Sequence, residues 1–291
     1  MSHDSWHVSV RLTLIRTSII PDAEGRPISE TPFLKIAHRG ASGSYPENTS
    51  VAFEKAIEHG ANMIDLDCHM TKDGNIVVIH DPTLNRTTNG RGLVKTKRLD
   101  ELKKLDAGSW FGPDFKDQRI LTLEEAIALT HRRSGLIIEI KNQPQLHLGI
   151  EIRILFMLNV AGATGRAIVT SSDYSALRRL RERSRDVRIG VLMSAEENED
   201  PLRIASELKA VAVLVRKDLL HPIFFREARR RGFPVLVWTV NETAEIERVA
   251  SMGVCGIVTD FPERLSGLGR DRKSTRLNSS HIQKSRMPSS A

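Results

Sequence analysis

The feature that most constrains this fold is an alternation of short apolar runs with amphipathic helical segments from about residue 35 onward. Strands that alternate with helices are typical of parallel β/α units, and eight strands predict a closed (β/α)8 TIM barrel of the α/β class. The runs interpreted as strands are KIAHRG, MIDLDCH, GLIIEIK, RAIVTSS, RIGVLM, AVAVLVR, PVLVWTV and CGIVTD. The helical segments include residues 49–60, 121–133, 173–184, 221–232 and 241–253.

One further apolar run, NIVVIH at residues 75–80, predicts a hairpin arm rather than a ninth barrel strand. The Asp-Gly pair before it favours a two-residue turn that sets Lys72 opposite Asn75. Counting back along this register places Asp67 opposite His80, and directly opposed residues share a face. His80 is therefore predicted beside Asp67 at the carboxyl end of the barrel, where barrel active sites lie.

Composition divides the chain into three parts. Residues 1–34 form an N-terminal extension whose structure the sequence does not specify, and residues 35–267 are predicted to form the barrel domain. Within the domain, residues from about 81 to 120 are too many for a plain loop and predict a small insertion, a candidate substrate lid over the barrel mouth. Residues 268–291 are polar and serine-rich, which predicts a disordered tail, and their similarity to translated cloning sequence indicates a non-native origin.

The overall charge of +7 is weak support for a nucleic-acid partner, because the tail alone carries six basic residues and one Asp. We expect no transmembrane segment, since the longest apolar runs are far shorter than the roughly 20 residues of a membrane helix. Arg11 and Arg16 interrupt the apolar residues near the N-terminus, which argues against an export signal. Only Cys68 and Cys255 are present, and two distant cysteines fit a cytoplasmic location. The oligomeric state stays open.

Three acidic residues are predicted to point into the barrel. Side chains alternate along a strand, so Asp65 and Asp67 share one face, and in the run LIIEIK so do Glu139 and Lys141. Close carboxylates raise one another's pKa unless a cation lies between them, and an all-oxygen set suits Mg²⁺ or Ca²⁺. Asp65, Asp67 and Glu139 are therefore candidate metal ligands. Carboxylates held by salt bridges in the barrel core remain the alternative.

Two histidines end segments on the same predicted rim. His38 ends the first strand and His80 ends the hairpin arm. Imidazole titrates near neutral pH, so the two together suggest a general acid and a general base. Lys141 would supply a cation that binds a phosphodiester. Arg39 is a second candidate for this role, although strand alternation points it away from His38.

The motifs AHRGASGSYPENTSVAFEKAIEHGANMIDLDCHMTKDGNIVVIHDPTLNRTTNGRG, LDAGSWFG, LTLEEAI, LIIEIK, VWTVN and GIVTDFP occur in this order. Together they resemble the glycerophosphodiester phosphodiesterase family over about residues 35–265. The resemblance implies a barrel like that of phospholipase C, a divalent cation, and hydrolysis of a small-molecule glycerophosphodiester to sn-glycerol 3-phosphate and an alcohol. It implies that the glycerol 2-hydroxyl attacks phosphorus to give a cyclic phosphate, which water then opens.

The same resemblance implies roles for single residues. His38 and His80 would be the acid–base pair, Asp65, Asp67 and Glu139 the metal ligands, and Arg39 and Lys141 the phosphate contacts. Trp238 is a candidate apolar wall for the substrate, with packing as the alternative.

One position departs from the family pattern. The family usually has Glu at the first of the paired acidic positions, where this chain has Asp65, one methylene shorter. This difference keeps a second reading open, a catalytically weak barrel that binds phosphodiesters. A lysophospholipase D acting on lysophospholipids is a further alternative.

Other residues in these motifs are weaker candidates for the site. Glu47 is interpreted as loop-ordering, while Asn48 or Thr49 caps the helix that follows. Asp260 is expected to orient arginine or backbone at the rim, and His69 ranks below His80 because it lies farther along the hairpin.

Overall fold

The computed structural model describes residues 33–142, 146–193 and 199–268. The proposed extension and tail, except for Phe33, Leu34 and Leu268, lie outside the described residues. Eight parallel strands form a closed barrel, because β1 pairs with both β10 and β2. In sheet order the strands are β1 (Leu34–His38), β10 (Gly256–Thr259), β9 (Val235–Trp238), β8 (Ala212–Arg216), β7 (Arg188–Met193), β6 (Ala167–Ser171), β5 (Gly135–Ile140) and β2 (Met63–Met70). The predicted barrel is confirmed.

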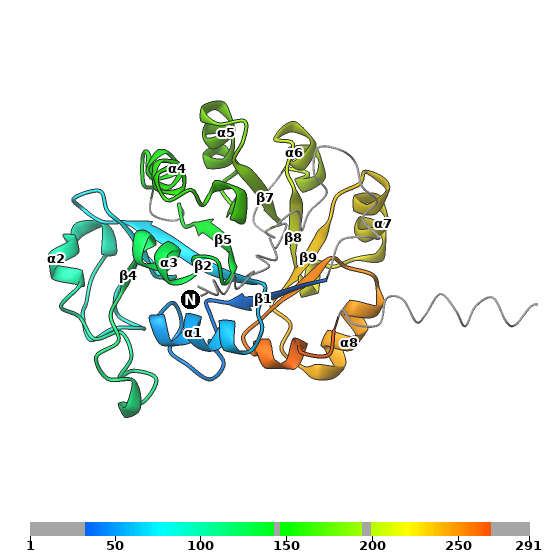
Figure 1. Cartoon of the computed structure of the whole chain (residues 1–291). Coiled ribbons are helices and arrows are strands. Elements are labelled where there is room, and N and C mark those ends of the chain that lie inside the picture. The colour runs from blue at the N-terminus through cyan, green and yellow to red at the C-terminus, as the bar shows by residue number, and fades with distance from the viewer. Residues whose placement is uncertain (1–32, 143–145, 194–198, 269–291) are drawn as a thin grey trace, which may run out of the picture.

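Helices surround the strands, as Figure 1 shows. The five predicted segments form helices, and two further helices, α4 and α6, complete the ring. The bounds are α1 (Ser50–Glu58), α3 (Leu123–Leu129), α4 (Ile150–Val160), α5 (Tyr174–Arg183), α6 (Pro201–Glu207), α7 (Pro222–Arg230) and α8 (Thr243–Ser251). None of the helices in the described part of the chain has the length and apolar character needed to cross a membrane.

The alternation of side chains along the strands separates two apolar layers. Residues such as Ile64 and Leu66 pack outward in the large core shared with the helices. Leu34, Ile36, Met63, Ile137 and Leu236 belong to a second cluster inside the barrel. Because side chains two apart share a face, the inward series continues toward the carboxyl ends of these strands with polar residues and Trp238. The barrel interior is therefore apolar at one end and charged at the other.

The hairpin after β2 is present, but its predicted register is wrong by one residue. β3 (Ile76–Val78) pairs antiparallel with β2 so that Cys68 lies opposite Val78. The ladder continues with a bond from the Ile79 N–H to the Asp67 carbonyl, so His80 lies one position beyond the residue opposite Asp67.

The cause is a three-residue turn in place of the predicted two-residue turn. The Thr71 N–H donates to the carbonyl of Asn75, and Gly74 adopts a left-handed φ of 81°. The Thr71 hydroxyl donates to Asp73 Oδ1 and accepts from the Asn75 N–H. A three-residue loop with glycine in the left-handed position is a common hairpin connection, and these side-chain bonds favour it here.

The insertion after the hairpin packs against the hairpin around a small core that is distinct from the two barrel clusters. It contains α2 (Leu99–Leu102) and leads into β4 (Leu121–Thr122), which pairs with β3. In Figure 1 it lies to one side of the barrel, beyond α1 and α3. The buried residues of this core are Val77, Ile79, Leu84, Val94, Leu102, Ala107 and Ile120. Its role as a substrate lid stays a prediction.

Candidate active site

His38, at the end of β1, is held by a carboxylate from the neighbouring strand end. Its Nδ1 lies 2.6 Å from Oδ1 of Asp260, directly after β10. The same carboxylate accepts hydrogen bonds from the Ser42 hydroxyl at 2.9 Å and from Asn241 Nδ2 at 2.6 Å. Burial alone would raise the pKa of Asp260, but these hydrogen bonds outweigh burial and lower it to about 2. Asp260 is thus a fixed anion that orients the His38 ring.

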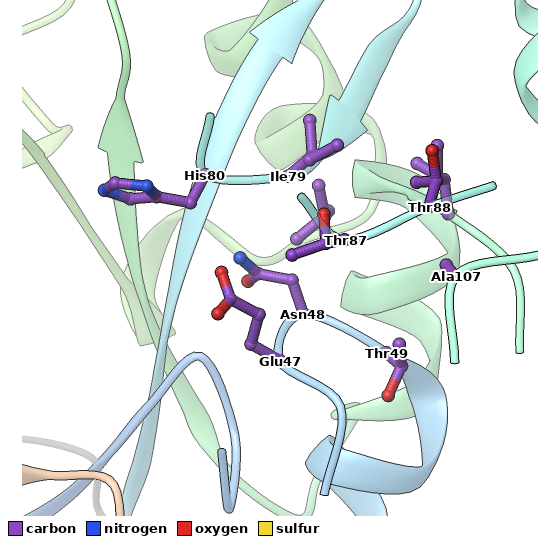
Figure 2. A pocket seen from close by; sticks show the side chains of 10 residues that line it. Glu47, Asn48, Thr49, Ile79, His80, Thr87, Thr88 and Ala107 are labelled. Carbon is purple, nitrogen blue, oxygen red and sulfur yellow. The ribbon is translucent and has the colours of Figure 1, made fainter. Parts of the chain in front are cut away.

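His80 is held in the same way by the residue that follows it. Its Nδ1 lies 2.8 Å from Oδ1 of Asp81, and Arg86 of the insertion donates to both oxygens of that carboxylate. Figure 2 shows the His80 ring directed away from Ile79 and Thr87. His80 lines a small cavity together with those two residues, and its ring points away from them.

Glu47 connects the insertion to the barrel rim. Its carboxylate accepts two bonds from Arg86, at 2.7 and 2.8 Å, and one from Arg39 Nη1 at 3.0 Å. Burial alone would raise the pKa of Glu47, but the two guanidinium groups lower it. Arg39 adopts a left-handed φ of 56°, so it leaves the β1 alternation and places its Nε 3.2 Å from Asp67 Oδ2. The expectation that Arg39 points away does not hold, because the strand ends at His38.

Asp67 and Glu139 meet at the Lys141 ammonium. The two acidic residues are register partners on β2 and β5, and Lys141 Nζ lies 3.1 Å from Asp67 Oδ1 and 2.7 Å from Glu139 Oε1. Asn48 adds a bond of 3.0 Å to Asp67 Oδ2. Burial would raise the pKa of Asp67, but Lys141 and Arg39 hold it well below its usual range. Both Asp67 oxygens are therefore already bound to donors.

Asp65 differs from Asp67 in having no donor. Among the described residues its side chain makes no hydrogen bond or ion pair. Burial, and then the charges of Asp67 and Glu139, raise its pKa to about 7 despite His38 and Lys141. A carboxylate in this environment has an excess of negative charge nearby that a cation would relieve.

The acidic set can be tested against the predicted divalent cation. Within residues 33–142, 146–193 and 199–268, no group of three or more His, Cys, Asp or Glu side chains is arranged to hold a metal ion. The ammonium of Lys141 lies where Asp67 and Glu139 converge. In donor chemistry the set fits, because it offers only carboxylate oxygens and Asp65 lacks a counter-charge.

Comparison with known proteins shows which family has this architecture. Residues 38–264 match the glycerophosphoryl diester phosphodiesterase family. The chain belongs to that family. A glycerophosphodiester phosphodiesterase of Caldanaerobacter subterraneus is 40% identical over 245 residues, which cover 81% of this chain and 98% of the relative. One of Bacillus subtilis is 32% identical over 269 residues, 87% of this chain and 92% of the relative.

Solved structures agree with the family assignment. An Oleispira antarctica phosphodiesterase in complex with the product sn-glycerol-3-phosphate superposes with a TM-score of 0.73 at 26% identity, covering 82% of this chain and 98% of that one. A glycerophosphodiester phosphodiesterase of Agrobacterium tumefaciens gives 0.70 at 27% identity, covering 79% and 97%. This member of the family is an enzyme, a phosphoric diester hydrolase.

Most predicted site residues of this phosphodiesterase lie at the charged end of the barrel. Trp238 ends β9, and its Nε1 is buried without a hydrogen-bond partner among the described residues. It packs on the inner apolar cluster, so both packing and substrate contact stay open for it.

Sequence reasoning missed the residues that hold the histidines. Asp81 and Arg86 are absent from the predicted site, and the prediction places Asp260 at the rim without its bond to His38. Asn48 contacts Asp67, whereas Thr49 is the helix cap. An available signal was the acidic residue directly after His80, because a neighbouring carboxylate often orients imidazole.

Proposed function

We propose that this enzyme catalyses metal-dependent hydrolysis of glycerophosphodiesters to sn-glycerol 3-phosphate and an alcohol, with His38 and His80 as general acid and base. One observation carries the proposal: each histidine is bound through Nδ1 to a carboxylate, at 2.6 Å for His38 and 2.8 Å for His80. Neither Nε2 atom forms a hydrogen bond with any described residue. A neutral ring whose Nδ1 donates to a carboxylate has Nε2 ready to accept a proton.

The two rings allow the protons of the reaction to balance. In the first step the glycerol 2-hydroxyl oxygen bonds to phosphorus, one histidine takes its proton, and the bond from phosphorus to the alcohol oxygen breaks. The other histidine, protonated beforehand, gives its proton to the departing alcohol. In the second step water opens the cyclic phosphate, and the two histidines exchange roles. Asp260 and Asp81 stabilise whichever ring carries the positive charge.

The charges around the site favour a requirement for a cation. Six acidic side chains (Glu47, Asp65, Asp67, Asp81, Glu139 and Asp260) are accompanied by three basic ones (Arg39, Arg86 and Lys141). An anionic phosphodiester would be repelled by this surplus. Asp65, Asp67 and Glu139 would hold Mg²⁺ or Ca²⁺, which would offset the surplus and withdraw charge from the phosphate oxygens.

Arg39 and Lys141 orient the acidic residues and are the proposed phosphate contacts. Each is ion-paired with two carboxylates. Lys141 lies between Asp67 and Glu139, and a divalent cation held by those oxygens would leave its ammonium available to the phosphate.

The proposal is tested by assaying several glycerophosphodiesters and lysophospholipids with and without a chelator. Chelation should abolish hydrolysis, and added Mg²⁺ or Ca²⁺ should restore it. Full turnover in excess chelator by protein that contains no metal would contradict the cation requirement. Hydrolysis confined to lysophospholipids would instead identify a lysophospholipase D.

A further inference from the structure

A buried pair of histidines lies next to the backbone of the proposed catalytic residue His80. His69 is the next inward residue of β2 after Asp67, and His147 lies in the loop between β5 and α4. They are 1% and 4% exposed. Nδ1 of His69 is 3.0 Å from Nε2 of His147, and Nε2 of His69 is 3.0 Å from the backbone carbonyl oxygen of His80. The mechanism above uses neither ring.

The direction of these hydrogen bonds follows from the groups involved. A carbonyl oxygen only accepts, so the His69 proton must be on Nε2. Burial favours the neutral ring, and a neutral ring with Nε2–H has Nδ1 as an acceptor. Nε2 of His147 then donates to His69. The two rings form a chain of donors that ends on the His80 carbonyl.

His80 needs such support because it lies past the end of the hairpin ladder. The last backbone bond of the ladder toward the barrel mouth joins the Ile79 N–H to the Asp67 carbonyl at 3.0 Å. The next contact toward the barrel mouth is made by a side chain, because His69 Nε2 donates to the carbonyl oxygen of His80. Asp81 and Arg86 fix the ring of His80, whereas His69 fixes the backbone from which the ring extends.

The pair is itself attached to the barrel. The His147 N–H donates to Asn142 Oδ1 at 2.7 Å, and Asn142 Nδ2 donates to Asp173 Oδ2 at 2.6 Å. Asp173 is the N-cap of α5. His147 is therefore tied through Asn142 to a helix cap, and it donates to His69 from this fixed position.

We propose that His69, supported by His147, is a positioning residue that sets the distance of the His80 ring from substrate. This inference rests on the proposed role of His80. A misplacement near 1 Å can cost about 100-fold in rate, so one buried bond at this point is sufficient to affect turnover.

The test is a double-mutant cycle with His69→Leu, His80→Ala and the double variant, assayed on glycerophosphocholine at saturating Mg²⁺ or Ca²⁺. His69→Leu should lower kcat by about 10- to 100-fold with little change in KM. In the His80→Ala background it should cause no further loss, because the group that it positions is gone. His69→Gln, whose amide can both donate and accept, should recover most of the activity. Thermal unfolding of each variant checks the fold.

The results separate this inference from the proposed function. If His80→Ala is slow and His69→Leu lowers kcat by the same factor in both backgrounds, the positioning role is wrong while the role of His80 stands. If His80→Ala turns over at nearly the wild-type rate, the positioning role of His69 and the catalytic role of His80 are both wrong. Should His69→Leu fail to fold, His147→Leu takes its place in the cycle, since Asn142 binds only the backbone of residue 147. Equal losses from His147→Leu in both backgrounds would again overturn the positioning role.

Discussion

The two proposed catalytic histidines are supported by different parts of the molecule. His38 binds Asp260, and both residues lie at the ends of paired barrel strands, β1 and β10. His80 binds the next residue in the chain, Asp81, which is held by Arg86 from the insertion. The side chain of His38 is 16% exposed and that of His80 is 32% exposed. One ring is thus fixed by the barrel, and the other by a hairpin and an appended segment.

This difference suggests that the two histidines are held with different rigidity. β1 is paired on both sides, with β10 and with β2, and cannot shift without disturbing the closed barrel, so the His38 side is rigid. The His80 side depends on a segment with a separate small core and on ion pairs near the surface. We expect changes in the insertion to affect His80 and to leave His38 in place.

The largest contrast should come from replacing the two supporting carboxylates. Asp260→Asn sets an amide against the amide donor of Asn241, whereas Arg86, which is 41% exposed, can turn to solvent when Asp81→Asn is introduced. We expect kcat to fall on the order of 100-fold for Asp260→Asn and about tenfold for Asp81→Asn, since a positioned acid or base contributes at least the larger factor. Steady-state kinetics of both folded variants measures the contrast. A larger loss for Asp81→Asn would reverse the comparison.

Removing Arg86 should have a smaller effect. Arg86→Ala deletes the contacts that join Asp81 to Glu47, and we expect a loss in kcat of roughly three- to tenfold because exposed ion pairs contribute about 1 kcal/mol. Arg86→Lys should not restore activity, since an ammonium cannot replace the paired guanidinium bonds. The matched control is Arg91→Ala in the same insertion, an exposed arginine with no partner among the described residues. Equal effects of Arg86→Ala and Arg91→Ala on kcat would show that the insertion does not support His80 through Arg86.

The ionised Asp260 on the His38 side should also make the free energy of unfolding depend on pH in acid. The pKa of Asp260 is lowered from 3.8 to about 2 in the folded state, so its stabilisation is present above the unfolded value and is lost as pH falls through the folded value. The free energy of unfolding of wild type relative to Asp260→Asn should therefore decrease by about 2 kcal/mol between pH 5 and pH 2. Urea unfolding at several pH values measures this difference. Asp114→Asn, at an exposed aspartate, should show no such trend.

The smallest effect is expected at Trp238, which lies on neither histidine side. Trp238→Leu should raise KM about fivefold with a minor change in kcat, because the loss of apolar contact of about 1 kcal/mol affects substrate and transition state alike. Trp110→Leu in the insertion serves as the control. Unchanged KM with reduced thermal stability would assign Trp238 to packing alone.

The sequence predicted the barrel because eight apolar runs alternate with helical segments, and it predicted the inward carboxylates because side chains alternate along each strand. Regular strands alternate strictly, so Asp65, Asp67 and Glu139 could be placed on the inner face without knowing any contact. The structure puts Asp67 and Glu139 side by side as register partners. The assignment of all three as metal ligands stays a prediction.

The predictions that went wrong lie where regular structure ends. The hairpin register depended on hydrogen bonds among Thr71, Asp73 and Asn75, which an Asp-Gly pair alone does not specify. Arg39 escaped the alternation by taking a left-handed conformation after β1. Asp260 and His38 are 222 residues apart in the sequence, and only the closure of the barrel brings them together.

The central claim, that two carboxylate-held histidines act as acid and base, is tested most directly by kcat of His38→Ala and His80→Ala in folded, metal-loaded protein. Each variant should lose on the order of 10²- to 10⁴-fold in kcat while its affinity for the divalent cation persists. A folded and metal-loaded His80→Ala enzyme within about threefold of wild type would contradict the claim, given the contribution expected of a positioned acid or base.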